Sequence, residues 1–126
     1  MSDWYKFRGW DATGQKGLVY GDLTHTKKVL KEDPYLADRV MVGGYEVVSD
    51  SVGLFTGLKD KNGKEIFEGD WVLLEGVGIF NVRYSTSMCQ FGLYGERGFV
   101  DALKELQVDR YEIVGNVFGT PELLEQ

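Results

Sequence analysis

The sequence contains one cysteine, Cys89, and one histidine, His25, among 126 residues. A single cysteine forms no internal disulfide, so a reduced compartment such as the cytoplasm is the simplest expectation. The common zinc sites draw on several Cys and His residues, and one of each does not build them. Catalysis by a Cys89–His25 pair is disfavoured, because Ser87-Met88-Cys89 has no recognised catalytic context. We therefore expect no catalytic residues and no metal.

Long apolar runs are also missing. No run approaches the roughly 18 residues that a membrane span requires, and the first eight residues lack the apolar stretch of a signal peptide. There are 2 prolines against 17 glycines, together with 7 Tyr, 7 Phe and 3 Trp. This composition is typical of short strands joined by tight turns. We expect no contact with a membrane.

Positive charge is the minority. The formal net charge is −6, and residues 51–126 carry 7 Lys/Arg against 12 Asp/Glu. Nucleic acids are bound by neutralising phosphates, so this balance argues against a general DNA or RNA binder without excluding a local basic patch. No glycine pattern matches a P-loop or dinucleotide fingerprint, so no nucleotide cofactor is expected.

The chain shows many short alternating or aromatic segments separated by glycine turns, which predicts antiparallel strands. Gly43-Gly44 and Asn62-Gly63 have the composition of tight hairpin turns. The predicted strands cover residues 4–10, 18–23, 39–42, 45–48, 54–58, 71–74, 79–84, 90–94 and 111–117.

Three segments read differently. Residues 24–38 are polar, lack periodicity and contain Pro34, which favours a loop holding at most a short helix. Phe99 and Leu103 stand at helical spacing in a stretch that is ambiguous between helix and strand. Thr120-Pro121-Glu122 has the composition of a helix start, which predicts a short C-terminal helix.

These elements predict a mainly β (α+β) fold. We expect a β-rich N-terminal subdomain over residues 1–50 packed against an SH3-like small β-barrel over residues 51–126. The two subdomains are expected to form one cooperative unit, and the boundary between them is not marked by any clear linker.

Four pieces of the sequence, in order from one end of the chain to the other, carry a resemblance to a known family. They are Phe7-Arg8-Gly9-Trp10-Asp11, Val19-Tyr20-Gly21-Asp22-Leu23, the run from Val52 to Val72, and Tyr111 to Phe118 followed by Pro121-Glu122-Leu123-Leu124. On these pieces the chain resembles the YopX family of phage and prophage proteins. The resemblance implies a phage-associated protein of a bacterial host with an SH3-like C-terminal part, and it implies no activity and no catalytic residues.

Several acidic and amide residues follow one another closely between Asp60 and Asp70. A Mg²⁺ or Ca²⁺ site is one interpretation, but the spacing lacks the terminal Glu of a calcium loop. The stronger interpretation is structural. Asp60 and Asn62-Gly63 build a turn, and Asp70 accepts backbone N–H bonds beside Gly69.

The N-terminus is crowded with aromatic residues beside Lys6 and Arg8. Aromatic rings next to basic residues hold single-stranded nucleic acid in many proteins, but alternating aromatic residues more often fill a small core. If Trp4, Tyr5 and Trp10 are exposed, they are candidates for a protein–protein interaction surface, because Trp and Tyr anchor such interfaces.

The leading hypothesis is a non-enzymatic accessory protein that works through protein–protein contacts, including self-association into a homo-oligomer. One alternative is a nucleic-acid-associated module, which needs its basic residues to converge on one face. They are Lys27, Lys28, Lys31, Arg39, Lys59, Lys61 and Lys64. Another is an acidic mimic of nucleic acid that blocks a host enzyme, which needs carboxylates spaced along one face.

Overall fold

The computed structural model describes residues 6–30 and 33–117 of the chain, and these residues form antiparallel strands with two short 3-10 helices. The chain divides into two compact units, Met1–Leu54 and Phe55–Gln126. The division lies within β6 (Gly53–Lys59), four residues after the boundary expected from sequence.

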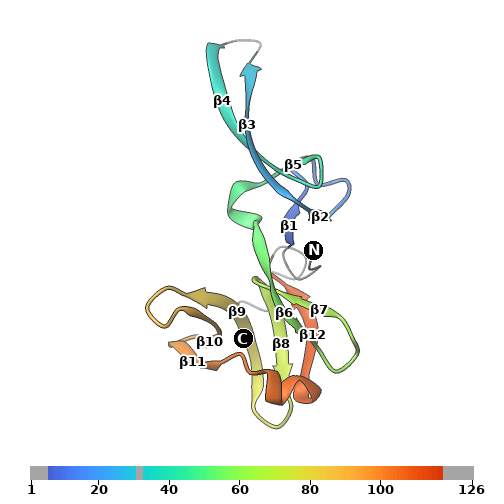
Figure 1. The fold of residues 1–126 in the computed structure, drawn as a ribbon, viewed down its shortest axis with the longest axis vertical. Coiled ribbons are helices and arrows are strands. Elements are labelled where there is room, and N and C mark those ends of the chain that lie inside the picture. The colour runs from blue at the N-terminus through green and yellow to red at the C-terminus, as the bar shows by residue number, and fades with distance from the viewer. Residues whose placement is uncertain (1–5, 31–32, 118–126) are drawn as a thin grey trace. The chain divides into compact units, whose positions relative to one another are not determined.

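The first unit contains five strands (Figure 1). Two of them form a long hairpin, and the three shorter strands lie at the base of that hairpin. Its small core contains Val19, Val42 and Val47, each buried, with partly buried apolar residues packed against them. The elements of this unit are β1 (Phe7–Trp10), β2 (Leu18–Gly21), β3 (Leu23–Leu30), β4 (Asp33–Val42), β5 (Tyr45–Val47) and the 3-10 helix η1 (Ser49–Ser51).

Strands β3, β4 and β5 form one sheet in that order, and β4 is much longer than β5. The β4–β5 turn is Gly43-Gly44, with φ of 59° and 87°, as a two-residue hairpin turn requires. Glycine is needed at position 43 for a second reason, because a Cβ there would clash with the carbonyl oxygen of Tyr20. The predicted hairpin about these glycines is confirmed.

The expectation of a loop or short helix over residues 24–38 is wrong. These residues belong to β3 and β4, which pair along their length from Leu23 opposite Val42 to Leu30 opposite Asp33. A ribbon of two strands, mostly polar, need not show the alternation that marks a half-buried strand, so periodicity missed it. Pro34 falls where the register shifts, which is a place where a strand tolerates proline.

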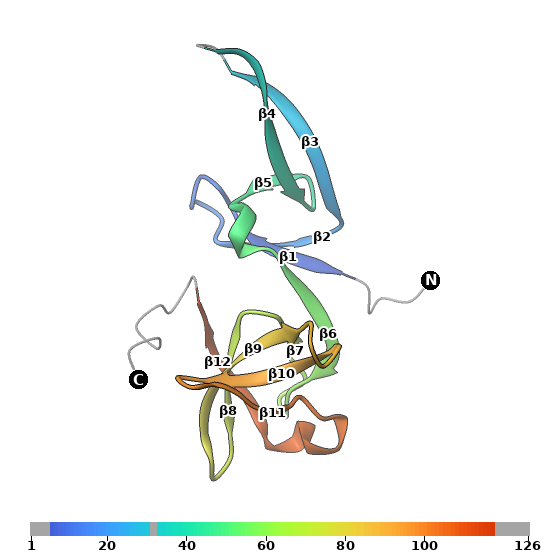
Figure 2. The ribbon, with the colours of Figure 1, turned by 90° about the vertical axis from the view of Figure 1, so that its left-hand side faces the viewer.

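The second unit is a five-stranded antiparallel sheet in the order β11-β10-β9-β8-β12, curled into a half-barrel (Figure 2). Consecutive strands from β8 to β11 are neighbours, and β12 closes on β8. The elements of this unit are β7 (Glu65–Phe67), β8 (Asp70–Leu74), β9 (Gly78–Ser85), β10 (Gln90–Gly95), β11 (Gly98–Ala102), the 3-10 helix η2 (Glu105–Arg110) and β12 (Tyr111–Asn116).

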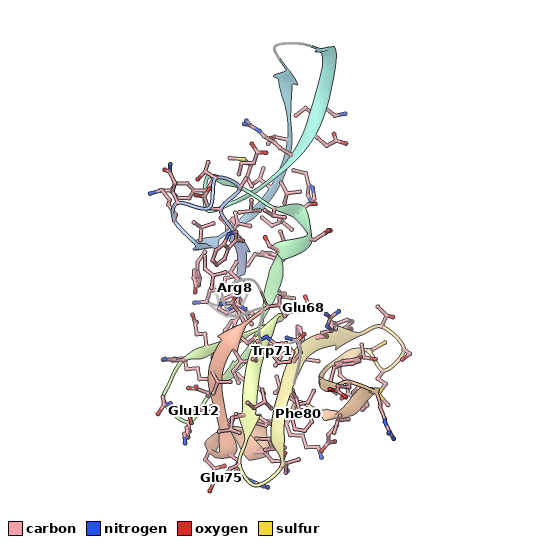
Figure 3. The ribbon with its side chains drawn as sticks, turned by 180° about the vertical axis from the view of Figure 1, so that it is seen from behind. Arg8, Glu68, Trp71, Glu75, Phe80 and Glu112 are labelled. Atoms are coloured by element: carbon pink, nitrogen blue, oxygen red, sulfur yellow. The ribbon has the colours of Figure 1, made fainter. Side chains whose placement is uncertain are left out.

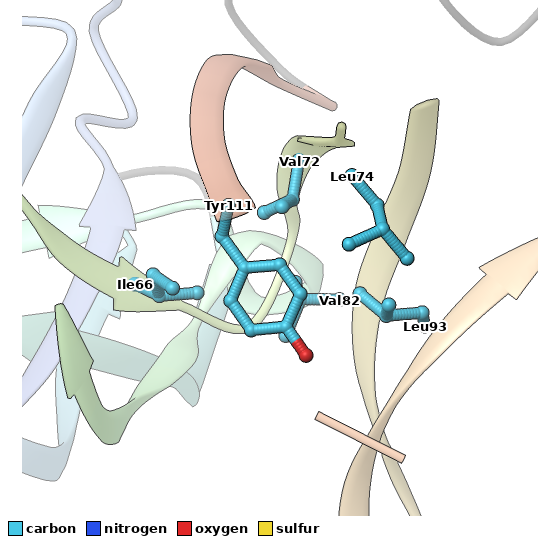
Figure 4. Packing of buried hydrophobic residues seen from close by; sticks show 6 residues of the cluster. All are labelled: Ile66, Val72, Leu74, Val82, Leu93 and Tyr111. Carbon is cyan, nitrogen blue, oxygen red and sulfur yellow. The ribbon is translucent and has the colours of Figure 1, made fainter. Parts of the chain in front are cut away.

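A single apolar cluster fills the concave side of this sheet (Figure 4). Tyr111 is fully buried at its centre, and its hydroxyl accepts the backbone N–H of Lys104 at 3.0 Å. The hydroxyl thereby satisfies a donor just before η2, so one side chain both fills the core and anchors a loop. The other buried members are Ile66, Val72, Leu74, Val82 and Leu93.

The ambiguous stretch from Phe99 onward is resolved as a strand followed by a 3-10 helix. Phe99 pairs with Tyr94 across β10 and β11, and their rings meet edge to face with centroids 5.5 Å apart. Leu103 packs against the core cluster as the chain leaves β11. The apolar spacing therefore reflects a strand and the loop after it.

The mainly β fold is confirmed, because most of the described residues lie in strands. The SH3-like form of the second unit stays a prediction. The expected C-terminal helix at residues 120–126 lies outside the described residues. Within the described ranges, no helix has the length and apolar character needed to cross a membrane.

Candidate functional site

The first unit has a groove where β5 ends and β4 continues. Strand β5 pairs with β4 only from Val42 opposite Tyr45 to Val40 opposite Val47. Beyond this point the chain turns away, since the N–H of Val48 donates to the carbonyl of Trp10 at 2.9 Å. Strand β4 runs on from Arg39 to Asp33 with β3 on one side. Its other edge has no strand beside it among the described residues.

The register shows which backbone groups face this free edge. A two-residue turn is closed by a hydrogen-bonded pair, here Val42 and Tyr45, and every second residue of β4 then points its N–H and C=O the same way. The N–H of Gly43, of the opposite parity, donates to Asp22 on the β3 side at 3.1 Å. The N–H and C=O groups of Asp38 and Leu36 therefore face the open edge.

The groove has a volume of about 550 Å³, within the range of roughly 300–1,000 Å³ typical of ligand sites. Its floor is mixed: two valines stand beside charged and hydroxyl groups. The lining residues come from all three strands and from η1, and they are His25, Thr26, Asp38, Arg39, Val40, Glu46, Val47 and Ser49.

Two contacts organise the charges around the groove. The Nε of Arg39 donates to the Oγ1 of Thr26 at 2.6 Å. Thr26 and Arg39 are paired, so their side chains are on the same face of the sheet, and this bond holds the guanidinium there. The carboxylate of Asp38 lies 3.3 Å from the Nζ of Lys27, directly across the ribbon. Because the Lys27 ammonium is already paired with Asp38, the Arg39 guanidinium is the basic group best placed to meet an incoming anion, although the Glu46 carboxylate lines the same groove.

The residues predicted as an interaction surface are placed only in part. Trp4 and Tyr5 lie outside the described residues. Trp10 ends β1, pairs with Leu18 and is half-buried, and its backbone N–H donates to the Oγ of Ser51 at 2.7 Å. Its role at an interface stays a prediction.

The acidic residues between Asp60 and Asp70 are used in turns, as the sequence indicated. Asp60 is 5% exposed, and its carboxylate accepts the backbone N–H groups of Asn62, Lys64 and Ile113, each at 2.9 Å. Asp70 is 1% exposed and accepts the N–H of Phe67 at 2.8 Å. Among the residues that the structure describes, no three His, Cys, Asp or Glu side chains gather as a metal site would need.

His25 and Cys89, the two residues considered for nucleophilic catalysis, belong to different units. His25 lies on β3 and lines the groove, whereas Cys89 is exposed in the turn between β9 and β10. The Sγ of Cys89 lies 3.5 Å from the carbonyl oxygen of Thr86, within its own turn.

Trp71 is the one buried side chain, among those described, whose polar atom has no hydrogen-bond partner. It lies near the start of β8, with Glu75 just beyond the other end of that strand (Figure 3). The indole is 8% exposed, and its N–H finds no acceptor in the described part of the chain. Nothing in the sequence singled out this residue.

The sequence was compared with protein-family models and with known proteins. A family model described as YopX protein matches residues 6–125. The chain belongs to the YopX family. The match spans nearly the whole length and includes all four pieces on which the resemblance was based, so the expectation of a YopX-like protein is confirmed. No curated protein matches the chain.

Among solved structures, the chain is similar to the crystal structure of protein EF1440 from Enterococcus faecalis. The two share 23% sequence identity and a TM-score of 0.56, over 95% of this chain and 97% of the other. At this identity the similarity supports a shared fold and says nothing about activity. This YopX-family chain therefore has a recognised fold on which function must be argued from its own surface.

Sequence reasoning singled out two members of the groove for other reasons: Arg39 as one of a set of basic residues, and His25 as half of a disfavoured catalytic pair. Thr26 and Asp38 were missed because residues 24–38 were expected to form a loop. Val40, Glu46 and Val47 lie in segments predicted as strands, but the groove between those strands was not predicted. One signal was available: the Gly43-Gly44 turn fixes the start of the β4–β5 register, and β5 is followed by the turn-forming Ser49-Asp50-Ser51. That combination predicts a short strand beside a longer one.

Proposed function

We propose that this YopX-family protein is a non-enzymatic protein-interaction module and that the hairpin β3–β4 makes the contact. The observation that carries the proposal is the length of this hairpin beyond β5 (Figure 1). From Thr26 opposite Arg39 to Leu30 opposite Asp33, the two strands pair only with each other among the described residues.

A two-stranded ribbon without a third strand has two disadvantages for a folded protein. An isolated two-stranded hairpin is marginally stable in water, because it has no third strand or packed layer to stabilise it. Unpaired strand edges also invite pairing with another chain. A partner that adds a strand or covers a face offsets both disadvantages, and this is the simplest reason for a protein to carry such a ribbon.

The proposal includes an accessory role in a phage or prophage, in the cytoplasm of the bacterial host. Membership of the YopX family supports the phage association, and the single cysteine supports a reduced compartment. The contact is made either with another copy of the chain or with a different protein, and no catalytic step is assigned.

The test is a variant in which residues 27–38 are replaced by Asn-Gly. Thr26 and Arg39 form a hydrogen-bonded pair, which is the geometry that an Asn-Gly turn closes, and the buried core at the hairpin base is untouched. Wild type and variant are compared by light scattering on a sizing column, at low and high salt, and by pull-down from bacterial lysate.

We expect wild type to show either a discrete mass above 14.2 kDa or a recovered partner, and the shortened variant to lose it while remaining folded. Circular dichroism and thermal unfolding of the variant provide the control. A wild type that stays monomeric at all concentrations and recovers no partner contradicts the proposal, as does an association that the shortened variant retains in full.

A further inference from the structure

We propose that the groove beside β4 binds an extended segment of a partner protein as an added strand, with an acidic side chain opposite Arg39 and an apolar one opposite Asp38. This inference rests on the proposed function and names the chemistry of the partner. It starts from the backbone, because strand addition draws its affinity from main-chain hydrogen bonds and its specificity from alternate side chains.

The backbone of β4 presents a ladder that β5 begins and leaves unfinished. Val40 pairs with Val47 as the last rung of β5, and Asp38 and Leu36 are the next residues of the same parity. Each offers one N–H donor and one C=O acceptor toward the groove. A segment that lies in line with β5 and antiparallel to β4 would continue the ladder where Val48 leaves it.

Side chains of the added strand would meet two different surfaces. The residue opposite Asp38 has its side chain on the face that holds Val40 and Val47, of which Val47 is 4% exposed. An apolar side chain there extends the small core of the first unit. The remaining half-exposure of Val40 indicates that this core is open on the groove side.

The neighbouring residue, opposite Arg39, has its side chain on the other face of the sheet. Directly opposed residues on adjacent antiparallel strands have Cβ atoms roughly 4.5–5.5 Å apart, so a carboxylate there comes within reach of the guanidinium. The Nε of Arg39 is held by Thr26, which leaves the terminal nitrogens of the same group to form the second interaction. Glu46 pairs with Met41 and so has its carboxylate on this same face, where it opposes an added negative charge. The directly opposed Arg39 guanidinium lies closer to the added residue, and for this reason we expect an acidic residue at this position.

The experiment uses the full chain and an array of short, labelled synthetic peptides in which Asp or Glu stands next to Val or Leu. Members with Lys or Ala in the acidic position serve as comparisons, and binding is measured by fluorescence anisotropy. We expect acidic peptides to bind, and replacement of the acidic residue by Ala to weaken binding roughly two- to fivefold. With Arg39→Glu, the preference should change to the Lys-containing peptides.

The matched control is Lys64→Glu, which changes the net charge equally at an exposed position of the second unit. It should leave the preference for acidic peptides intact. If Arg39→Glu and Lys64→Glu shift the preference equally, the effect is one of overall charge and the assignment to Arg39 is wrong.

Strand addition is tested separately by N-methylation along the best-binding peptide. Only every second amide of an added strand donates to β4, so affinity should fall about tenfold at alternate positions and stay unchanged between them. A scan without this alternation overturns the strand geometry.

Two further outcomes overturn the inference without deciding the proposed function. If no array member binds while the shortened hairpin abolishes association, the module uses another part of the ribbon. If no peptide binds and Asp38→Pro, which removes an edge-facing N–H, converts an oligomer to monomer while Asp38→Ala does not, the groove belongs to a second copy of the chain.

Discussion

The hairpin end of the first unit and the half-barrel of the second unit are both antiparallel β structure, yet they differ in how their strands are stabilised. In the half-barrel, six fully or nearly buried side chains form one cluster on the concave face. In the first unit, three buried valines lie at the base of the hairpin, and the ribbon beyond them pairs with no third strand among the described residues. The larger buried cluster is therefore in the half-barrel, and the open strand edge is in the first unit.

The physical reason is geometric. A sheet of five strands can curl and enclose apolar side chains, whereas two strands expose both faces. Stability within one chain is not uniform, and the parts with few buried contacts open first. We therefore expect the two regions to respond independently to substitutions in each of them.

The largest effect is expected from Leu93→Ala. Leu93 is fully buried in the core of the half-barrel, and such a truncation costs about 2–5 kcal/mol through lost burial and the cavity that remains. Urea unfolding should show this loss, and hydrogen exchange should accelerate in β8 to β12 but not at the base of the hairpin. Val100→Ala, at a 50% exposed residue of β11, is the control and should change stability by less than about 0.5 kcal/mol.

The next effect is expected from Asp60→Ala, which removes the acceptor of three backbone N–H groups. Hydrogen bonds to a charged acceptor contribute about 1.5–3 kcal/mol each in favourable cases, and the loss is partly relieved by water, so we expect about 2–3 kcal/mol. Asp60→Asn should be intermediate, because one amide oxygen still accepts. Chemical denaturation of the two variants decides this, and an Asn variant as unstable as the Ala variant would contradict the role of the acceptor.

A glycine comparison tests the turns of the two units. Gly43→Ala places a Cβ in a clash with the carbonyl oxygen of Tyr20, in addition to the positive φ. Gly63→Ala has φ of 80° and open space around it. We expect about 1–2 kcal/mol for Gly63→Ala from backbone conformation alone, and clearly more for Gly43→Ala. Equal thermal shifts for the two would show that the contact with Tyr20 relaxes freely.

The smallest effect concerns two carboxylates whose pKa is lowered for different reasons. The pKa of Asp11 lies below its ordinary value of 3.8, first because the Thr13 hydroxyl donates to it and then through backbone N–H groups. The pKa of Asp101 is lowered chiefly by the Lys104 ammonium, 3.2 Å away. Each carboxylate stabilises the fold fully above pH 3.8, and that stabilisation is lost as the pH falls below this value through the lowered pKa.

These two carboxylates should separate in salt. At about 1 M salt an exposed ion pair is screened within roughly 3 Å, whereas neutral hydrogen bonds are not. NMR titration should therefore show the pKa of Asp101 rising toward 3.8 and that of Asp11 moving less. A parallel shift of both groups would mean that Lys16, and not Thr13, holds the Asp11 pKa down.

Sequence reasoning predicted those parts of this protein whose cause is local. The Gly43-Gly44 and Asn62-Gly63 turns follow from residues that adopt positive φ, and the carboxylates of Asp60 and Asp70 follow from the need of turn N–H groups for an acceptor. In the half-barrel, β8 was predicted from a short apolar run and β9 from alternation, whereas β11 was left ambiguous between helix and strand. Each of these signals is contained within a few consecutive residues.

The hairpin and the groove were not predictable in the same way. The strands β3 and β4 are held by pairing with each other, and polar residues on a two-sided ribbon leave no periodic pattern. The groove exists because β5 stops at Val47 while β4 continues, which is a difference in length between strands joined through tertiary pairing. Local propensity contains no information on where a neighbouring strand ends.

By itself, the sequence determined that this chain is a β-rich member of the YopX family with turn-bound carboxylates, because composition, turn chemistry and family motifs are properties of consecutive residues. Only the tertiary structure decided that Arg39, Thr26 and Val47 meet beside an open strand edge. Those residues come from three strands, and their meeting depends on register, which is set by hydrogen bonds between segments that are distant in the chain.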